Sequence, residues 1–574
     1  MTRKSLIRGA AILAAAGLAN RFLGAVSRIV LPSLIGDEGV GLYQMAYPVY
    51  GVFLVVSTAG VPVAVSKLVA EQTARNNPAG ALKVLKVATA ILFLTGTFFS
   101  AALALGAGPI ARYVARDARA ALAIVAVSPA VLILSVTSAF RGYFQGMQEM
   151  GPSALSQVSE QVVRVSAMIG LAWLLLPRGV EFSAAGANLG AVLGGAAGFL
   201  VLLVAYFRLQ HVPGSWKVSW AQVRAVFARS GREGGGARRR GDGESRGRSA
   251  AEDGAPGGGA RAIEDYMGST LALVRRIFDL SLPVVLAAAI MPLMQFLDIA
   301  IVPMRLASAG FSPDEVTRLF GRLTGMAQPL MYFPTLVTSA VAASAVPAIS
   351  EALARRDRST LSARAEEAIR LGFLFALPSA VGLFVFAKEF SIMLRWPAEV
   401  AVPLRALAFG TVFLALQQVS SGILQGLGEV TVPVRNLAKG ALAKLVVSLV
   451  LTGMPAYGIR GAAYGTVAAF AVAWLLNVAA LVRMLGLSID VMNTAVKPVL
   501  GVAVMALVAR AAYAGVYRAV ASNTLGALAA IVVAVAVYGL ALLVTGVVGR
   551  HELEVFPGGG KIASVLERLG LLRR

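Results

Sequence analysis

The sequence predicts an all-α integral membrane protein with about fourteen transmembrane helices. We expect two parallel six-helix lobes around a central cavity, followed by two further helices near the C-terminal end. Three observations predict this fold class: the apolar composition, short motifs that recur about 280 positions apart, and a basic, glycine-rich segment between the two copies.

The composition excludes a soluble protein. The chain has 574 residues, of which 57% are hydrophobic and 14% charged, and its mean hydropathy is +0.76. A soluble core of this size cannot hide so many apolar runs. There is no cysteine, which excludes disulfides, thiol catalysis and cysteine-ligated metal sites, and the two histidines lie in polar segments. We therefore expect no metal site and no cofactor.

The apolar runs follow one another at regular intervals, and each is long enough to cross a bilayer. The runs are 6–31, 43–70, 83–108, 119–143, 153–176, 184–207, 275–303, 323–350, 366–389, 398–421, 434–453, 459–483, 493–514 and 522–548. The first run resembles a signal peptide in its basic start, but the apolar pattern resumes after Arg21, so we expect it to stay in the membrane.

The charges of the loops predict the orientation. Basic residues precede the first run and flank the loops after the second and eighth runs, whereas the loop after the first run carries Asp37 and Glu38. Basic loops stay on the cytoplasmic side, so we expect both termini in the cytoplasm of a bacterial cell. The net charge of +23 is also explained by basic loops in the cytoplasm, and it does not indicate nucleic-acid binding. The loop with Arg112, Arg116 and Arg119 goes against this pattern.

Three motifs recur in the same order in the two halves, which indicates a duplicated membrane unit. The pairs are F-Q-G-M-Q-E from Phe144 and L-Q-G-L-G-E from Leu424, E-Q-T-A-R from Glu71 and E-A-L-A-R from Glu351, and G-A-N-L-G-A-V from Gly186 and G-A-A-Y-G-T-V from Gly461. Six runs precede the middle segment, so the second copy starts on the same side as the first, and the repeats are parallel.

The expected organisation has four parts. Residues 1–207 form an N-terminal six-helix lobe and residues 208–270 a flexible, basic cytoplasmic linker, because that segment is too rich in glycine and arginine to form a core. Residues 271–485 form the second lobe, and residues 486–574 form two extra helices and a cytoplasmic tail. Gly186, Gly190, Gly194 and Gly198 recur every four residues, which is typical of close helix packing.

Ionisable residues inside apolar runs are candidates for function, because a charge at mid-membrane costs about 2.5–3.5 kcal/mol on insertion scales. Arg21 and Arg28 lie two helical turns apart on one face of the first run and have no acid beside them. They need an anion from elsewhere, unless one of them extends to the membrane interface.

The seventh run, which opens the second copy, carries Asp298 and Arg305. Asp298 is the strongest candidate for coupling to a cation or a proton. The alternative is a structural ion pair with an arginine such as Arg21. We take Arg305 as a further candidate for binding an anion.

The fifth run carries Glu160 and Arg164, which are four residues apart and can neutralise each other. Glu160 is a second candidate for ion coupling, although a structural role for the pair is favoured. Adding the repeat offset of 280 to Arg164 gives Lys444 on the eleventh run. A basic side chain at this position in both copies predicts a cationic cavity wall.

The opening of the chain resembles stage V sporulation protein B-like polysaccharide transporters. The resemblance rests on Asn20-Arg21-Phe22-Leu23-Gly24, on G-D-E-G-V-G-L-Y-Q from Gly36, on Pro48, and on Gly60-Val61-Pro62 with Ser66-Lys67, and later on Leu424-Gln425-Gly426. This family is grouped with lipid II flippases and MATE exporters. It implies two six-helix lobes around a V-shaped cavity, with two extra helices in the flippase branch.

The resemblance also implies a substrate. Lipid II flippases carry an arginine pair in the pattern R-x-L-G-x-x-R, in which Arg21 and Gly24 match, but position 27 is Ser and the second arginine is Arg28. Such arginines would bind a lipid-linked diphosphate sugar. We therefore expect a flippase for an undecaprenyl-diphosphate-linked glycan, most plausibly lipid II, in spore cortex synthesis. Expected partners are this substrate, membrane lipids and cell-wall synthases, with no nucleic acid.

Two other functions stay open at this point: a MATE-like, cation-coupled exporter of organic cations, and a membrane scaffold for wall assembly that transports nothing. An exporter of cations needs an acidic cavity, and a scaffold needs no cavity. An enzyme is not expected, because the sequence has no phosphate-binding loop and no catalytic constellation. Coupling to Na⁺, H⁺ or the membrane potential is left undecided.

Overall fold

The computed structural model describes residues 3–58, 60–211, 270–487 and 490–547. All regular elements in these residues are helices. The predicted linker therefore lies outside the described residues from 212 to 269, and the predicted tail lies outside them from 548 onward.

The first lobe begins with a long helix, α1 (Arg3–Thr58), which is broken at Gly36. Gly36 has a φ of 70°, in the region that glycine adopts without strain, so the chain reverses there and α1 has two arms. The remaining elements of this lobe are α2 (Val61–Ala74), α3 (Pro78–Pro109), the π-helix η1 (Ile110–Ala115), α4 (Ala120–Gly146), α5 (Met150–Leu175), the short 3₁₀ turn η2 (Leu176–Arg178) and α6 (Val180–His211).

The second lobe begins with α9 (Thr270–Ser308). It continues with α10 (Pro313–Gly321), the π-helix η3 (Arg322–Ala327), α11 (Gln328–Tyr332), α12 (Thr335–Ala354), α13 (Arg358–Val385), α14 (Ala387–Met393), η4 (Ala398–Val400), α15 (Ala401–Ala408), α16 (Gly410–Gly426), α17 (Thr431–Leu451) and α18 (Ile459–Leu485). The two extra helices are α19 (Lys497–Val520), preceded by η5 (Met492–Val496), and α20 (Asn523–Val544), and they pack on α13 and α14.

The fold class is confirmed, but the number of fourteen spans is not. Within the described residues, eleven helices are long and apolar enough to cross a membrane, or twelve if the bent pair α15–α16 is one span. Two features account for the smaller number. The two arms of α1 are continuous through the break at Gly36 and therefore form one long apolar segment instead of two. α17 carries three basic residues, Arg435, Lys439 and Lys444, and is therefore too polar to be included.

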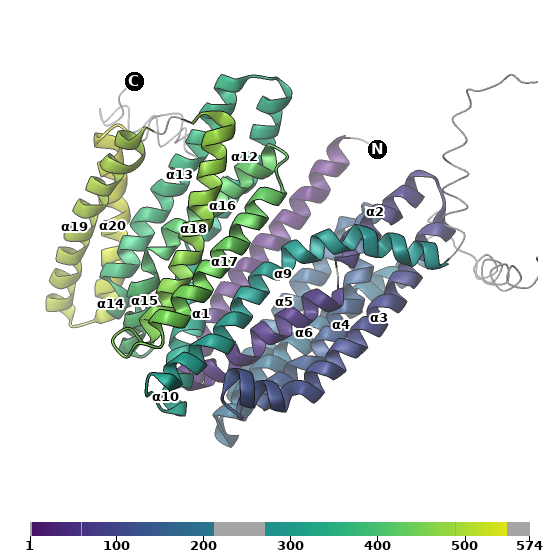
Figure 1. The fold of residues 1–574 in the computed structure, drawn as a ribbon, viewed down its shortest axis with the longest axis horizontal. Coiled ribbons are helices and arrows are strands. Elements are labelled where there is room, and N and C mark those ends of the chain that lie inside the picture. Colours follow the sequence, from purple (N-terminus) through teal and green to yellow (C-terminus); the bar gives the residue numbers. More distant parts are fainter. Residues whose placement is uncertain (1–2, 59, 212–269, 488–489, 548–574) are drawn as a thin grey trace, which may run out of the picture.

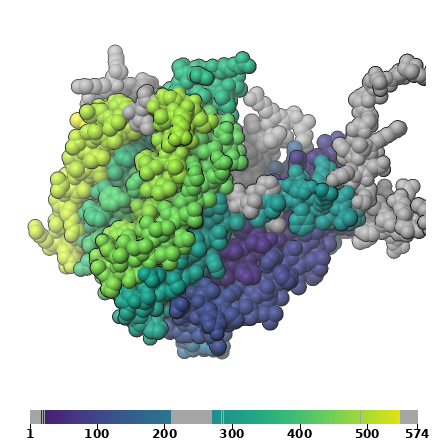
Figure 2. Space-filling model, in the orientation of Figure 1, coloured from purple at the N-terminus to yellow at the C-terminus, as the bar shows by residue number. Residues whose placement is uncertain are grey.

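The two lobes lie side by side, as Figure 1 shows, converging at the end that contains α10 and diverging toward the end that contains α2 and α12. We call these the α10 end and the linker end, because α6 ends and α9 begins toward the latter. The helices α1 and α9 pack against elements of both lobes. In Figure 2, α9 lies in teal across the blue surface of the first lobe before it reaches the second.

The recurring motifs form the same structure twice. At the end of α4, Glu149 N–H donates to Phe144 O at 2.9 Å, and at the end of α16, Glu429 N–H donates to Leu424 O at the same distance. The adjacent Gln148 and Gly428 both have positive φ, at 62° and 86°. The repeat therefore extends to individual turns of the backbone.

The two copies meet each other through equivalent positions near the α10 end. Gln44 Nε2 donates to the carbonyl of Thr324 at 2.8 Å, and these residues are 280 positions apart. Gly41 and Gly321 have the same separation, and a Cβ on Gly321 would lie 2.7 Å from Gly41 N. Residues that meet their own equivalents lie on a twofold axis, so an approximate twofold axis passes between the lobes here. This is the relation expected for parallel repeats.

Candidate functional site

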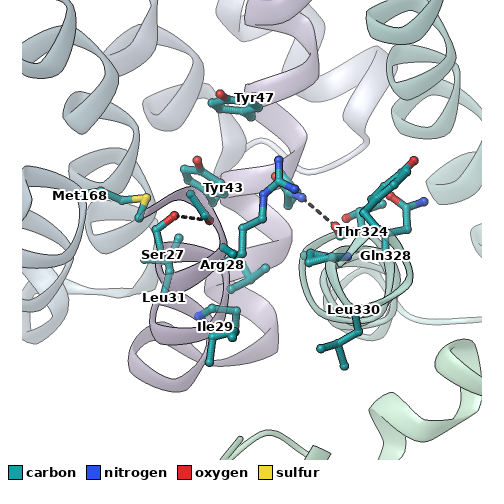
Figure 3. A pocket seen from close by; sticks show the side chains of 18 of the residues that line it. Ser27, Arg28, Ile29, Leu31, Tyr43, Tyr47, Met168, Thr324, Gln328 and Leu330 are labelled. Carbon is teal, nitrogen blue, oxygen red and sulfur yellow. Dashed lines mark hydrogen bonds between the residues drawn. The ribbon is translucent and has the colours of Figure 1, made fainter. Parts of the chain in front are cut away.

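A cavity of about 440 Å³ lies between the lobes. The first lobe lines it with both arms of α1 and with α5, and the second lobe lines it with α9, with the segment from α10 to α12, and with Trp396. Three of its lining residues are charged: Arg28, Arg164 and Asp298. Figure 3 shows Arg28 reaching up between the tyrosines on one side and Thr324 and Gln328 on the other.

Arg28 is the most available charge in this cavity. Its side chain is exposed, and it has neither an ion pair nor a hydrogen bond with any residue that the structure describes. The arm of α1 that carries it passes the second lobe, where Trp396 Nε1 donates to Ile29 O at 3.4 Å and Ser33 Oγ donates to Leu394 O at 2.8 Å. These contacts fix the helix and leave the guanidinium directed into the cavity.

Arg164 belongs to a group of three charges in the first lobe. Glu160 on α5 accepts a hydrogen bond from Arg141 Nη2 at 2.5 Å and another from Arg164. α6 covers this group closely, because a Cβ on Gly194 would lie 2.6 Å from Glu160 O. The Nε–H groups of Arg141 and Arg164 are buried and have no acceptor among the described residues. The group therefore has a net positive charge and donors to spare.

Lys444 has the corresponding place in the second lobe but a different partner. Its ammonium lies 2.6 Å from Asp298 Oδ2, and both side chains are only 5% exposed. Lys444 does not line the cavity, whereas Asp298 does. The structural ion pair considered for Asp298 is therefore present, with Lys444 as its partner rather than an arginine. It neutralises the one acid among the described residues that line the cavity.

Arg305 lies away from the cavity, and its Nε donates to the carbonyl of Leu449 at 2.7 Å. The side chain of Arg21 is outside the described part of the chain, so its predicted role stays a prediction. Glu160 also does not line the cavity. Of the predicted site residues, the structure thus brings Arg28, Arg164 and Asp298 together around one space.

Sequence reasoning missed several polar residues at this site. Arg141 lies inside an apolar run and would have been found by the rule that selected Arg164. The tyrosines and glutamines of the cavity carry no charge, so nothing in the composition of their helices singled them out. These residues are Tyr43, Gln44, Tyr47, Gln161, Gln295, Gln328 and Tyr332.

A cluster of charges joins the lobes at the α10 end. We call it the inter-lobe ion cluster. Its members in the first lobe are Asp37, Glu38, Asp117 and Arg119, and those in the second lobe are Asp314, Thr317, Arg318, Arg322 and Glu399.

The links between the lobes in this cluster are short. Arg322 Nε lies 2.7 Å from Asp37, and Arg119 lies 3.1 Å from Asp314. Arg119 also binds Glu38 at 2.7 Å and Asp117 at 2.8 Å. Three carboxylates therefore neutralise Arg119, one of the three arginines in the loop that goes against the pattern of loop charges.

Asp117 lies in the loop between two spans and is the most constrained acid of the cluster. Burial alone would raise its pKa, but hydrogen bonds from Arg119 and Thr317 outweigh this and hold the pKa below the usual value. Its carboxylate stays ionised at neutral pH and links the two lobes. Within the described residues, this cluster included, no three acidic or histidine side chains gather as metal ligands would.

Comparison with known proteins places the chain in a family. A family model described as polysaccharide biosynthesis protein matches residues 6–228, and a MatE model matches residues 283–450. Stage V sporulation protein B of Bacillus subtilis (strain 168) is 30% identical over 563 residues, which cover 98% of this chain and 99% of that protein. The chain belongs to the stage V sporulation protein B family.

A second relative agrees with this placement. Lipid II flippase MurJ of the same bacterium is 25% identical over 472 residues, covering 78% of this chain and 77% of that one. The family placement, a relative that is named a flippase and the long apolar helices confirm the expectation that this chain is a multi-pass membrane protein and not an enzyme.

Solved structures agree on the fold. A multidrug resistance MATE family transporter in an inward-facing conformation matches with a TM-score of 0.60 at 15% identity, covering 81% of this chain and 94% of that one. Lipid II flippase MurJ in an inward closed conformation matches with a TM-score of 0.56 at 14% identity, covering 92% and 97%.

Proposed function

We propose that this protein is a flippase that carries an undecaprenyl-diphosphate-linked glycan across the bacterial cytoplasmic membrane by alternating access. The substrate we propose is lipid II, and the setting is synthesis of the spore cortex. The similarity to stage V sporulation protein B and to a lipid II flippase supports this choice.

One observation carries the proposal: the accessible charge of the cavity is positive. Arg28 has no partner among the described residues, Arg164 keeps unused donors, and Asp298 is already bound by Lys444. A diphosphate carries negative charge and offers several oxygen acceptors, and arginine binds such groups with charge-assisted hydrogen bonds. In a cavity of low dielectric these contacts favour an anion over a cation.

The same observation argues against the two alternatives. An exporter of organic cations needs an uncompensated acid, and Asp298 is not one while Lys444 is bound to it. A scaffold that transports nothing has no use for a polar cavity of about 440 Å³ inside the membrane, because each polar group there costs free energy.

We infer the direction of opening from the two ends of the molecule. The inter-lobe ion cluster and the Gly41–Gly321 contact hold the lobes together at the α10 end. The basic loops lie at the other end, which we assign to the cytoplasm together with both termini. In this state the cavity would receive its substrate from the cytoplasmic leaflet, and transport would need the cluster to open.

The central test is binding of a glycan-carrying polyprenyl diphosphate to the purified protein. Arg28→Ala removes charge-assisted contacts worth about 1.5–3 kcal/mol, so affinity should fall about ten- to a hundredfold. Complementation of a flippase-depleted bacterium should fall as well. Arg460→Ala is the control, since Arg460 is exposed and outside the cavity.

Unchanged binding by both Arg28→Ala and Arg164→Ala would refute the cationic-cavity mechanism. Arg21→Ala, tested alongside, decides the role of that residue.

The orientation has its own test. Single cysteines introduced at Ser5, Ser245 and Ser564 of this cysteine-free chain should resist a membrane-impermeant thiol reagent on intact cells. Labelling at Ser245 from outside would overturn both the cytoplasmic linker and the inward direction of the cavity. Deletion of 234–259 should leave transport largely intact, because we expect no buried contacts there.

A further inference from the structure

Part of the cavity wall is uncharged but polar and aromatic. Tyr43 and Tyr47 lie one helical turn apart on the second arm of α1, and both line the cavity. Their rings are stacked, with centroids 5.7 Å apart and an angle of 25° between the planes. Tyr50 continues the row at 5.6 Å from Tyr47, but it is only 3% exposed and does not line the cavity. The row thus has a cavity part and a core part.

Most polar side chains of this wall make no hydrogen bond to another described residue. The hydroxyls of Tyr43 and Tyr47 make no hydrogen bond within the described residues, and the amides of Gln161 and Gln295 make none either. Gln44 differs, because its Nε2 donates to the carbonyl of Thr324 at 2.8 Å. Polar groups inside a membrane protein cost free energy unless water or a ligand satisfies them.

The chemistry of these groups selects a class of ligand. Amides and hydroxyls both donate and accept, so they suit a neutral group that is rich in hydroxyls and amides. Tyrosine adds an apolar ring surface that packs against the C–H groups of such a ligand. An acyl chain would leave the amides unsatisfied, and the positive charges of Arg28 and Arg164 in the same cavity disfavour an organic cation. A sugar ring, with or without an N-acetyl group, matches all of these features.

We propose that this wall is a binding subsite for the sugar ring that is attached directly to the diphosphate. It consists of Tyr43, Tyr47, Gln161 and Gln295. The inference rests on the proposed function, because it takes the arginines as the site of the diphosphate.

The positions of the two groups fit the covalent structure of such a substrate. Gln161 and Arg164 are three residues apart on α5, so they share a helix face, and both line the cavity. In the view of Figure 3, the Arg28 side chain extends into the same space that Tyr43 and Tyr47 border. A phosphate held by the arginines therefore places the sugar bonded to it against this wall. The cavity volume of about 440 Å³ is in the range of sites for small organic ligands, roughly 300–1,000 Å³.

The experiment compares two ligands: a polyprenyl diphosphate without sugar, and the same lipid carrying its glycan. The test variant is Tyr47→Leu with Gln161→Ala. It should bind the glycan-carrying lipid about tenfold more weakly than the wild type, as expected for the loss of two or three hydrogen bonds, and bind the bare diphosphate lipid within about twofold. Arg28→Ala should weaken binding of both lipids by the same factor. Tyr50→Phe, in the core part of the row, should change neither.

The outcomes are distinct. If the test variant loses affinity for both lipids equally, the wall does not recognise the sugar, and this inference is refuted while the proposed function stands. If the wild type itself binds neither lipid, the proposed function fails and this inference with it. Tyr47→Phe removes one hydroxyl and keeps the ring, so it repeats the test should the double variant unfold. In Tyr47→Phe, the affinity for the glycan-carrying lipid, relative to that for the bare diphosphate lipid, should still fall by about two- to fivefold.

Discussion

The two lobes carry a basic side chain at the same place in the repeat and use it in opposite ways. Arg164 on α5 faces the cavity, and Lys444 on α17 is held behind Asp298. The helices around them correspond, since a Cβ on Gly190 would lie 2.8 Å from Arg164 O and one on Gly465 would lie 3.2 Å from Lys444 O. The difference is therefore in the acid that each basic residue meets.

The location of these acids decides which lobe presents charge to a substrate. Glu160 lies on the same helix as Arg164 and is shared with Arg141, so one carboxylate faces two guanidinium groups. In the second lobe one carboxylate faces one ammonium. Duplication has kept the backbone, including its turns, while the charges have diverged. The cavity is consequently cationic on the side of the first lobe and nearly neutral on the other.

The largest effect should come from breaking the pair in the second lobe. Lys444→Ala leaves Asp298 as an uncompensated buried charge, which should destabilise the protein by about 3–5 kcal/mol. The double variant Lys444→Met with Asp298→Leu should recover most of that loss, because it removes both charges and keeps the volume. Thermal unfolding in detergent measures both. If the single variant were as stable as the wild type, the carboxylate would have to be neutral or hydrated, and the comparison of the lobes would lose its basis.

The corresponding change in the first lobe should affect binding more than stability. In Arg164→Ala, Glu160 still has Arg141 at 2.5 Å, so the loss of stability should be smaller than that of Lys444→Ala. Affinity for a glycan-carrying diphosphate lipid should fall about ten- to a hundredfold, because one charge-assisted contact is lost. Thermal unfolding and lipid binding, measured on the same two variants, should rank them in opposite orders. The same ranking in both assays would contradict the assignment of the anion site to the first lobe.

The next effect concerns the contact between the lobes. A Cβ on Gly321 would lie 2.0 Å from the carbonyl of Asp37, so Gly321→Ala cannot close the α10 end without a shift of backbone. Overpacking of this kind costs about 1–3 kcal/mol, which should move the population toward a state open at this end. Spin labels on cysteines replacing Tyr113 and Met454 would report a longer distance between the lobes. Gly170→Ala is the control, since nothing lies within 4 Å of its Cβ.

The sequence predicted much of the fold because the fold depends on patterns that are visible in one dimension. Long apolar runs can only form helices in a membrane. An even number of runs before the linker means that the two repeats start on the same side and are therefore parallel. The repeat offset also placed Arg164 and Lys444 at equivalent positions. The number of spans was not confirmed, because the basic residues of α17 and the break at Gly36 blur the boundaries between runs.

The site was less predictable, since it depends on which side chains meet across the lobes. Asp298 and Lys444 are 146 positions apart, and no local pattern indicates that they bind each other. Arg305 looked equivalent to the arginines of the first helix, but it donates to the backbone of α17 instead. The tyrosines and glutamines of the cavity wall gave no signal, because uncharged residues are ordinary in such helices.

The smallest effect should appear on acidification of the inter-lobe ion cluster. The pKa of Asp117 lies below its ordinary value of about 3.9, so its contribution to closure is complete above that pH and is lost only as the pH falls through the lower, folded-state value. Between pH 8 and pH 5 the distance between labels at positions 113 and 454 should therefore stay constant. Below about pH 4 the open population should rise. The arginine that pairs with Asp117 is partly exposed, so the pair should contribute about 0.2–1 kcal/mol and the rise should be about two- to fivefold. Asp117→Asn should show the same open population already at pH 8, because it keeps the shape of the side chain but not its charge. Opening of the wild type between pH 8 and pH 5 would mean that a group outside this cluster controls closure of the lobes at the α10 end. The ion pairs would then have no role in alternating access.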